Sequence, residues 1–352
     1  MTSFDHRIQP VSAQHASLIA KIDELKGQWL GGATLSPQVL GRLKRSVLVT
    51  STGASTRIEG AKLSDEDVEK VMRGLNIQTF ADRDKQEVKG YYELLTNAFD
   101  SWRTIRFGES TIKHWHKELL KYVEKDVAHR GEYKKQENKV QMIDAATGKP
   151  IAVLFATTPL YLTPKAIQEL VDWTQTALTN RRHHPLLVIG NFVVEFLKIH
   201  PFTDGNGRLS RVLTNLLLLQ AGYEYVPYVS HEKLVEDNKA EYYITLRKSQ
   251  QTFGAEKKDI TAWLDFFLNI VLQQSQRAVE LLKGEEVDKL LTAKQRAVLL
   301  YLQQVAEASP GEIAGATDVA QPTVRQALAK LVKLKKVERQ GQGRSTTYRI
   351  AR

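Results

Sequence analysis

The 352-residue sequence contains no cysteine. This absence excludes disulfide bonds, thiolate metal sites, iron–sulfur clusters and a cysteine nucleophile. Long apolar runs are also missing, because polar residues interrupt the stretch 186–199 and the stretch 212–219 is too short to cross a bilayer. The first ten residues lack the basic region and apolar core of a secretory signal. We therefore expect a cytoplasmic protein that does not associate with membranes.

The composition is typical of a globular protein, with one local excess of positive charge. Apolar residues make up 42% and charged residues 26% of the chain, and its length allows two or three domains. Residues 292–352 carry eleven Lys and Arg against four Asp and Glu, so this segment holds +7 of the total net charge of +10. The basic character belongs mainly to the C-terminal part, where it points towards DNA.

Helical patterns dominate the chain, with one interruption. Ser64, followed by three acidic residues, predicts a helix start, and Gly60 predicts the end of the helix before it. Two short apolar runs, 140–143 and 151–155, flank a segment with a glycine and predict two strands joined by a turn. The charged stretch 283–289 is the best candidate for a linker.

The most informative segment is 199–211, with the sequence IHPFTDGNGRLSR. An apolar helix is expected to end near its first residue, and another to begin near Arg208. Gly205 and Gly207 allow a tight loop between them, whose amides at a helix N-terminus can bind an anion. Arg208 and Arg211 lie one helical turn apart, so both can face that anion.

Two further residues of this segment suit phosphate chemistry. His200 can accept a proton near neutral pH. Asp204 is poorly placed to bind an anion but suits Mg²⁺, which binds proteins through one or two carboxylates together with substrate phosphates. The alternative is a capped helix junction with solvated arginines. The combination of base, metal ligand, arginines and anion loop favours transfer of a phosphate-containing group.

This segment resembles the active-site motif of the Fic family, H-P-F-x-D/E-G-N-G-R-x-x-R, at every defined position. The resemblance implies a mainly helical fold that transfers AMP from ATP to a Ser, Thr or Tyr hydroxyl of a protein. It also implies roles for these residues, with Phe202 as a buried anchor of the loop. The implied roles are His200 as base, Asp204 as Mg²⁺ ligand, Gly205, Asn206 and Gly207 as phosphate cradle, and Arg208 and Arg211 as ligands of the β- and γ-phosphates.

Two other segments extend the resemblance. The predicted strand pair lies where the family has its flap, a hairpin that holds the target by strand pairing, and it follows Gly131-Glu-Tyr-Lys134, which resembles the family's G-x-Y-R. Lys134 takes the place of the usual arginine, which would weaken a bidentate contact at this position. Tyr242 and Tyr243 match a tyrosine pair with one ring near the adenine, for which we favour Tyr243; core packing of the pair is the alternative.

Residues 55–60, STRIEG, resemble the family's inhibitory motif, (S/T)-x-x-x-E-(G/N), at Ser55, Glu59 and Gly60. The resemblance implies that Glu59 pairs with Arg211 and adds negative charge where a phosphate should lie. ATP would then bind in a pose unsuited to attack at its α-phosphate. The alternative is a solvated glutamate before a helix-ending glycine. In some relatives the corresponding glutamate also positions water for removal of AMP.

The basic C-terminal segment resembles a winged helix–turn–helix. Helices are expected at 292–305 and 310–316, and a third one from Pro322, followed by a two-stranded wing formed by 337–339 and 346–350. The expected inward face of the third helix consists of Val324, Leu328, Leu331 and Val332, and its outward residues include Thr323, Arg325, Gln326, Lys330 and Lys333. A basic third helix suits the DNA major groove. A protein–protein adaptor is the alternative.

Together these patterns predict a mainly α-helical protein with a Fic helical fold, a β-hairpin flap and a C-terminal winged helix–turn–helix. The expected parts are a helical region with the inhibitory helix at 1–105, a Fic core at 106–283 and the winged helix at 290–352. The expected function is adenylylation of a protein target, or of the chain itself, from ATP with Mg²⁺, held back by Glu59. The alternatives are removal of AMP, or a DNA-binding regulator whose core senses nucleotide. No residue pattern indicates a dimer, so a homodimer stays open.

Overall fold

Helices form most of the regular structure in the computed structural model, which describes residues 2–32, 35–74, 82–143, 150–255, 258–289, 291–334, 336–341 and 346–351. Contacts divide the chain into two compact units, 1–279 and 280–352. The helices of the first unit, of which the last crosses the boundary, are α1 (Ser3–Arg7), α2 (Ala13–Gly32), α3 (Pro37–Ile58), α4 (Asp65–Met72), α5 (Asp82–Ser101), α6 (Glu109–Leu119), α7 (Thr163–Asn180), α8 (Pro185–Ile199), α9 (Asn206–Gln220), α10 (His231–Asp237), α11 (Lys239–Gln251) and α12 (Thr261–Lys289).

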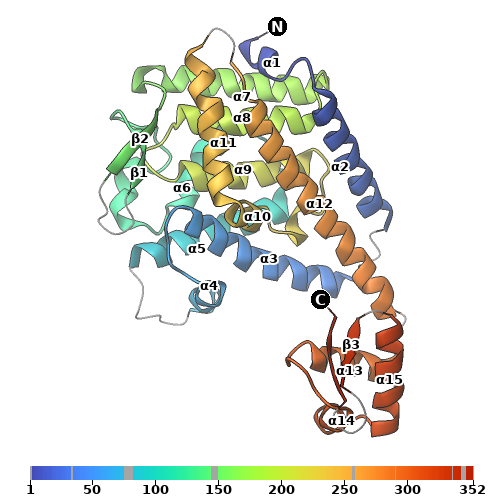
Figure 1. The fold of residues 1–352 in the computed structure, drawn as a ribbon. Coiled ribbons are helices and arrows are strands. Elements are labelled where there is room, and N and C mark those ends of the chain that lie inside the picture. Colours follow the sequence, from blue (N-terminus) through green and yellow to red (C-terminus); the bar gives the residue numbers. More distant parts are fainter. Residues whose placement is uncertain are drawn as a thin grey trace. The chain divides into compact units, whose positions relative to one another are not determined.

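Helices α8 and α9 form the centre of the first unit. Nearly all residues of both helices are buried, so other elements surround each of them. Helix α8 packs against α7, α9 and α11, and α9 also packs against α5 and α6 (Figure 1). The loop between α8 and α9 is therefore held at both ends by buried helices. None of the helices in the described residues combines the length and apolar character needed to cross a membrane.

The inhibitory-motif segment folds as the sequence predicts. Helix α3 ends at Ile58, and Gly60 adopts a left-handed φ of 105°, which residues with a Cβ adopt only at a cost. Ser64 accepts a hydrogen bond from the Asp67 amide, and the Asp67 carboxylate accepts one from the Ser64 amide in return. The two predicted helix ends are thus confirmed, and they place Glu59 at the C-cap of α3.

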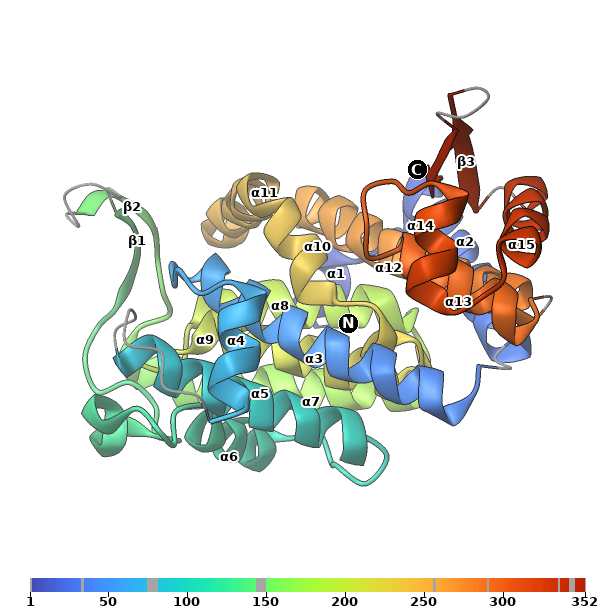
Figure 2. The same cartoon turned by 90° about the horizontal axis from the view of Figure 1, so that it is seen from below.

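Two antiparallel strands, β1 (Lys139–Ile143) and β2 (Pro150–Ala156), form at the place where the helical pattern breaks. Lys139 pairs with Ala156, and the register shifts twice along the ladder. Figure 2 shows the hairpin projecting from the helices, and its second strand also contacts α11. The predicted turn residues, 144–149, lie outside the described residues.

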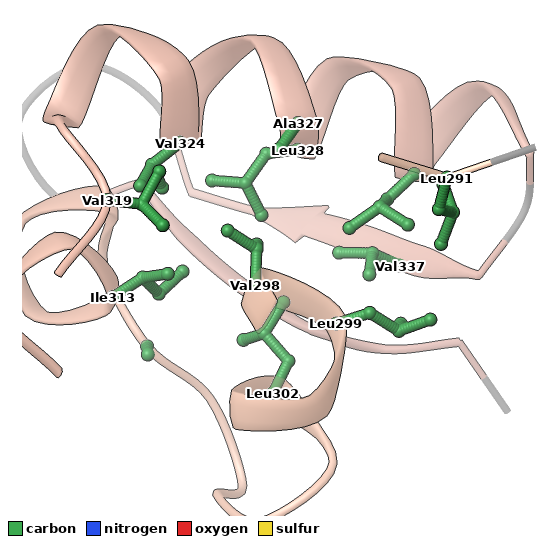
Figure 3. Close-up of a cluster of buried hydrophobic side chains, with 12 residues drawn as sticks. Leu291, Val298, Leu299, Leu302, Ile313, Val319, Val324, Ala327, Leu328 and Val337 are labelled. Atoms are coloured by element: carbon green, nitrogen blue, oxygen red, sulfur yellow. The ribbon is translucent and has the colours of Figure 1, made fainter. Parts of the chain in front are cut away.

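The second unit has its own core, which is drawn in Figure 3. Its elements are α13 (Ala293–Leu302), α14 (Pro310–Thr317), α15 (Gln321–Lys333), β3 (Val337–Gln340) and β4 (Thr347–Ile350), the last two paired as antiparallel neighbours. Val298, Leu302, Val324, Leu328 and Leu331 are fully buried in this core.

Two sequence expectations for this region are wrong. Val332 was expected to face inward, but it is 37% exposed, because the apolar face of α15 turns through Ala327 instead. The stretch 283–289 was expected to be a linker, but it continues α12 as helix up to Lys289. Glutamate and lysine are good helix formers, so a charged stretch of this composition can extend a helix as readily as it can form a linker.

Candidate active site

The Fic-like segment forms the α8–α9 loop. His200 is the C-cap of α8 and has a left-handed backbone, with φ 51° and ψ 62°. Gly205, with φ 78°, is the N-cap of α9 and provides no side chain to cap the first amides of that helix. The amides of the first turn of α9 therefore remain available to a negatively charged group, as expected for an anion cradle.

The imidazole of His200 is set up as a proton acceptor. Its Nδ1 lies 3.2 Å from the carbonyl oxygen of Leu197. A carbonyl only accepts, so Nδ1 carries the proton and Nε2 keeps its lone pair. Burial lowers the pKa of His200 below the ordinary value for histidine, which keeps the ring neutral.

Two side chains fix the loop between the helices. Asn206 Oδ1 accepts a hydrogen bond from the Phe202 amide at 3.0 Å, and Asn206 Nδ2 donates to the Phe202 carbonyl at 2.8 Å. Phe202 is fully buried and stacks on His116, with ring centroids 3.8 Å apart. The prediction of Phe202 as a buried anchor therefore agrees with its position.

His116 on α6 holds the same loop by hydrogen bonds. Its Nδ1 accepts from the Gly131 amide at 2.9 Å, so its Nε2 carries the proton and donates to the Asp204 carbonyl at 3.0 Å. Burial lowers the pKa of His116 to about 4. This histidine is therefore neutral and holds the backbone of the loop in place.

Asp204 lies between two arginines. Its Oδ2 accepts from Arg83 Nη2 at 2.7 Å and from Arg208 Nη2 at 3.1 Å, while its Oδ1 accepts from the Gly205 amide at 2.6 Å. Burial would raise the pKa of Asp204, but Arg208, the Gly205 amide and Arg83 hold it below its ordinary value. The carboxylate is thus ionised, as a metal ligand must be.

The donor set fits Mg²⁺ only together with a nucleotide. No group of three or more His, Cys, Asp or Glu in the described ranges could hold a metal ion by itself. Asp204 offers a single carboxylate whose side chain is 38% exposed. Mg²⁺ accepts such a site when phosphates and water supply its remaining ligands.

Arg208 and Arg211 leave α9 in different directions. Arg208 Nη1 pairs with Glu87 Oε2 of α5 at 2.6 Å, and its side chain is 3% exposed. Arg211 instead contacts α3. Its Nε donates to Ser55 Oγ at 2.8 Å, and its Nη2 donates to the Ser55 carbonyl at 2.9 Å and to Glu59 Oε1 at 2.7 Å.

The Glu59 carboxylate lies directly on the loop. A Cβ added to Gly207 would collide with Glu59 Oε1, so the carboxylate rests against the backbone at the start of α9. The same added Cβ would lie 3.4 Å from Arg211 Nη1, a buried nitrogen that has no hydrogen-bond partner among the described residues. An unpaired guanidinium nitrogen beside an uncapped helix start fits a phosphate group, and Glu59 occupies part of that space.

Tyr243 lies beside the same region. Its hydroxyl donates to the Ile58 carbonyl at 3.3 Å, next to Glu59. Tyr242 is buried and packs against Trp263 and Phe266, with ring centroids 5.7 and 5.8 Å away, while its hydroxyl interacts with Arg211. The two tyrosines therefore separate into one core residue and one residue at the edge of the site.

The residues singled out from the sequence converge on one place: Ser55, Glu59, His200, Asp204, Gly205, Asn206, Gly207, Arg208, Arg211 and Tyr243. Sequence reasoning missed Arg83, Glu87 and His116, which hold Asp204 and Arg208 from α5 and α6. The four-residue spacing of Arg83 and Glu87 shows that they share a helix face, but nothing local points to a loop 121 residues away.

Comparison with known proteins agrees with this geometry. Residues 106–218 match the model of the Fic/DOC family. The chain is 25% identical over 157 residues to a probable protein adenylyltransferase of Aquifex aeolicus (strain VF5), covering 42% of this chain and 48% of that protein. It is 27% identical over 146 residues to the protein adenylyltransferase Fic of Drosophila virilis, covering 40% of this chain and 28% of that protein. The chain thus spans about half or less of these curated relatives.

Solved structures show the same fold. A Fic family protein from Desulfovibrio desulfuricans G20 superposes with a TM-score of 0.62 and 22% identity, over 97% of both chains. Fic-1 (residues 134–508) from C. elegans gives a TM-score of 0.63 and 21% identity, over 78% of this chain and 74% of that one. Residues 106–218 of the chain thus match the Fic/DOC family in sequence, and the helical fold around them is shared with solved Fic structures.

Proposed function

We propose that this protein transfers AMP from ATP to a hydroxyl group of a protein. The observation that carries the proposal is that one loop holds two features together. His200 Nε2 keeps its lone pair, and the start of α9 is uncapped and carries the buried side chain of Arg211. A base and an anion cradle in one loop are what attack on a phosphate ester requires. The names of the curated relatives, protein adenylyltransferases, support the same reaction.

The reaction needs no nucleophile from the protein. His200 Nε2 takes the proton of the target hydroxyl, the hydroxyl oxygen forms a bond to the α-phosphorus of ATP, and the bond to the β-phosphate oxygen breaks to release pyrophosphate. Arg211 and the first amides of α9 hold the phosphates, and Arg208 and Asn206 keep that helix start in place. Mg²⁺, when bound at Asp204, would neutralise phosphate charge.

We assign three functional parts to the chain, as the sequence suggested: a helical region with the inhibitory helix at 1–105, the catalytic core at 106–283 and a winged helix–turn–helix at 290–352. The hairpin of β1 and β2 serves as the flap that holds the target segment by strand pairing. Tyr243, which lies beside Glu59 and Arg211, is the residue that we expect to contact the nucleotide base.

A label-transfer experiment tests the proposed function. Purified chain is incubated with Mg²⁺ and ATP that is labelled either at the α- or at the γ-phosphate. We expect protein-bound label from α-labelled ATP only, because the α-phosphate is retained in AMP. Label from γ-labelled ATP would indicate phosphoryl transfer instead. Absence of label from both forms, also in the Glu59→Gly variant, would leave the nucleotide-sensing alternative.

The pH dependence of transfer follows from the burial of His200. Burial disfavours the imidazolium ion and lowers the pKa of His200 below 6.5, so more acid is needed to protonate the ring. Protonation removes the lone pair that accepts the target proton. We therefore expect kcat/KM of the Glu59→Gly variant to be constant through neutral pH and to fall only below pH 6.5. An acid limb centred above that value would contradict the assignment of His200 as the base.

We further propose that Glu59 inhibits the enzyme and that α10 holds it in place. Arg57, two residues before Glu59, forms a bidentate pair with Glu236 of α10, at 2.5 Å from Nε to Oε1 and 3.1 Å from Nη2 to Oε2. Its third nitrogen lies 2.9 Å from Asp65 Oδ1. Lys239 Nζ also donates to the Arg57 carbonyl at 3.1 Å. The end of α3 is thus tied to α10 and to the start of α4.

Glu236→Gln should loosen this attachment and weaken the inhibition while Glu59 stays intact. A partly exposed charge pair contributes about 1 kcal/mol, so we expect transfer to rise by about fivefold. The control is Glu241→Gln, which removes the same charge from an exposed position on α11. Equal rates in the two variants would show that the contact with Arg57 does not support the inhibitory position.

A second function, DNA binding, is favoured by the exposed face of α15. Arg325, Gln326 and Lys333 are exposed there, whereas Val324, Ala327 and Leu328 of the same helix face the core (Figure 3). We propose that this face contacts the DNA major groove and its phosphates. Binding to duplex DNA should weaken steeply with added salt, and Arg325→Ala should reduce the slope of log K against log salt by about 1.

Lys294→Ala is the matched control for this test, because it removes one positive charge from an exposed position on α13. It should leave the salt slope close to that of the wild type. Loss of binding in both variants to the same extent would indicate a general charge effect, and absence of binding at low salt would refute the assignment.

A further inference from the structure

Hydrogen bonds join both ends of the β1–β2 hairpin to the backbone around His200. From the end of β2, the Thr158 amide donates to the Lys198 carbonyl at 3.2 Å. From the segment before β1, the Lys134 amide donates to the Pro201 carbonyl at 2.9 Å, and Asn138 Nδ2 donates to the Phe202 carbonyl at 3.0 Å. The segments that flank the hairpin therefore contact residues 198–202, the catalytic segment, on both sides of His200.

Lys134 lies at the centre of these contacts. The residue is only 4% exposed, and its ammonium nitrogen has four oxygen neighbours. They are Asn138 Oδ1 at 2.9 Å, Thr157 Oγ1 at 2.9 Å, the Thr158 carbonyl at 2.7 Å and the Ile199 carbonyl at 3.2 Å. One side chain thus connects the segment before β1, the segment after β2 and the last residue of α8.

Within the described ranges, no carboxylate forms a salt bridge with Lys134 Nζ, although the charge of Glu137 raises the pKa of this lysine. Burial lowers the pKa of this lysine to about 8. Burying a cation is costly unless oxygen acceptors replace its hydration, and the four oxygens do so here. The four oxygen acceptors thus form a site that suits a compact cation with several N–H donors.

The hydrogen bonds of Lys134 act on the backbone on both sides of His200. His200 has a left-handed backbone, with φ 51°, which a residue with a Cβ adopts only at a cost in free energy. Lys134 bonds the carbonyl before His200 through its side chain and the carbonyl after it through its amide. The peptide group before His200 and the peptide group that follows Pro201 are thereby fixed against the hairpin, which restricts the direction of the imidazole.

We propose that Lys134 is a positioning residue for the reaction, which links the hairpin to the catalytic histidine and sets the orientation of His200. The proposal rests on the proposed function of the site. The Lys134 ammonium and its oxygen partners would then hold two things in a fixed relation. One is the hairpin, to which a target strand pairs, and the other is His200, the base that acts on the target. Loss of the ammonium should displace His200 without altering the nucleotide site at Arg211 and Gly207, which lies on the other side of the loop.

The test uses the full chain in the Glu59→Gly background. Lys134→Met keeps the length of the side chain and removes its donors. We expect kcat to fall by about 10- to 100-fold, as for small displacements of a catalytic group, while KM for ATP stays within about twofold. Lys134→Arg, which supplies donors in another geometry, should retain more of kcat than Lys134→Met. A rise in KM at constant kcat, or an unchanged kcat, would overturn the proposal.

The control is Lys113→Met, because Lys113 lies over the ring of Tyr133, the neighbour of Lys134, at 4.2 Å. It should leave kcat unchanged. If Lys134→Met does not fold, Thr157→Val removes one oxygen of the same group, and its kcat should fall in the same way. A drop in Tm with unchanged kcat in that variant would show a purely structural role.

Amide hydrogen exchange separates this proposal from the proposed function. Lys134→Met should speed exchange of the amides of residues 134 and 158, which donate to the catalytic segment, and Lys113→Met should not. This readout needs no transfer activity. If the Glu59→Gly protein transfers no AMP, the proposed function fails, whereas unchanged exchange at these two amides in Lys134→Met refutes the coupling itself.

Discussion

In the Glu59→Gly background, His200→Ala is expected to lower AMP transfer by about 10²- to 10⁴-fold, the range for loss of a general base. The alanine leaves no group to accept the proton of the target hydroxyl. His200 contributes no hydrogen bond to the α9 start or to Arg211, so nucleotide binding should persist. Initial rates with α-labelled ATP, together with calorimetric measurement of ATP affinity, check both parts of the expectation.

A surface histidine provides the control for this variant. His114 lies on α6 and is exposed, so His114→Ala should transfer AMP at the rate of the Glu59→Gly parent. If His200→Ala kept more than about a tenth of the parent rate, another group would have to accept the proton. If it lost ATP affinity together with the rate, the histidine would act in binding rather than in proton transfer.

Glu59→Gly itself should raise AMP transfer by about 10- to 100-fold over the wild type. The carboxylate accepts a hydrogen bond from Arg211 at 2.7 Å and rests on the backbone of Gly207. A hydrogen bond to a charged group contributes about 1.5 to 3 kcal/mol, which corresponds to that change in rate. Without the Glu59 side chain, the Arg211 guanidinium is free to bind the phosphates of ATP, and the space beside Gly207 is open to them.

Two graded variants test this explanation. Glu59→Gln keeps the size and one acceptor but removes the negative charge, so its rate should lie between those of the wild type and Glu59→Gly. Ser55→Ala removes only the hydroxyl that accepts from Arg211 Nε at 2.8 Å and should have a smaller effect. Equal rates in wild type and Glu59→Gly would mean that Glu59 does not restrain the enzyme. Label that appears and then disappears in the wild type would favour AMP removal.

The local parts of the site could be predicted from sequence because they depend on chain geometry. Gly60 ends α3, Ser64 begins α4, and the α8–α9 loop turns between His200 and Gly205. Each feature follows from the conformations that its own residues prefer. The same is true of the strand pair, whose apolar runs differ in period from the helices around them.

The supporting contacts could not be predicted, because they join segments far apart in the chain. Arg83 reaches Asp204, Glu87 reaches Arg208 and His116 reaches the carbonyl of the loop, all through packing of α5 and α6 against α9. The sequence of each helix shows only an amphipathic pattern with charges, which fits solvent as well as a partner. The helical continuation of α12 through 283–289 was missed for a related reason, because composition alone does not distinguish an extended helix from a linker.

The contact between Glu59 and Gly207 limits how this protein can change during evolution. The hydrogen atom that replaces a side chain at Gly207 is what admits the carboxylate, and the same opening is what would admit a phosphate. A substitution that filled this space would exclude inhibitor and substrate together, so a regulated enzyme would become an inactive one. A lineage that needs a permanently active form would therefore change Glu59 or the contacts that hold it, such as the pair of Arg57 with Glu236 of α10, and leave the loop alone. Under the proposed inhibition, a single substitution at Glu59 would remove the restraint, whereas a substitution at Gly207 would not.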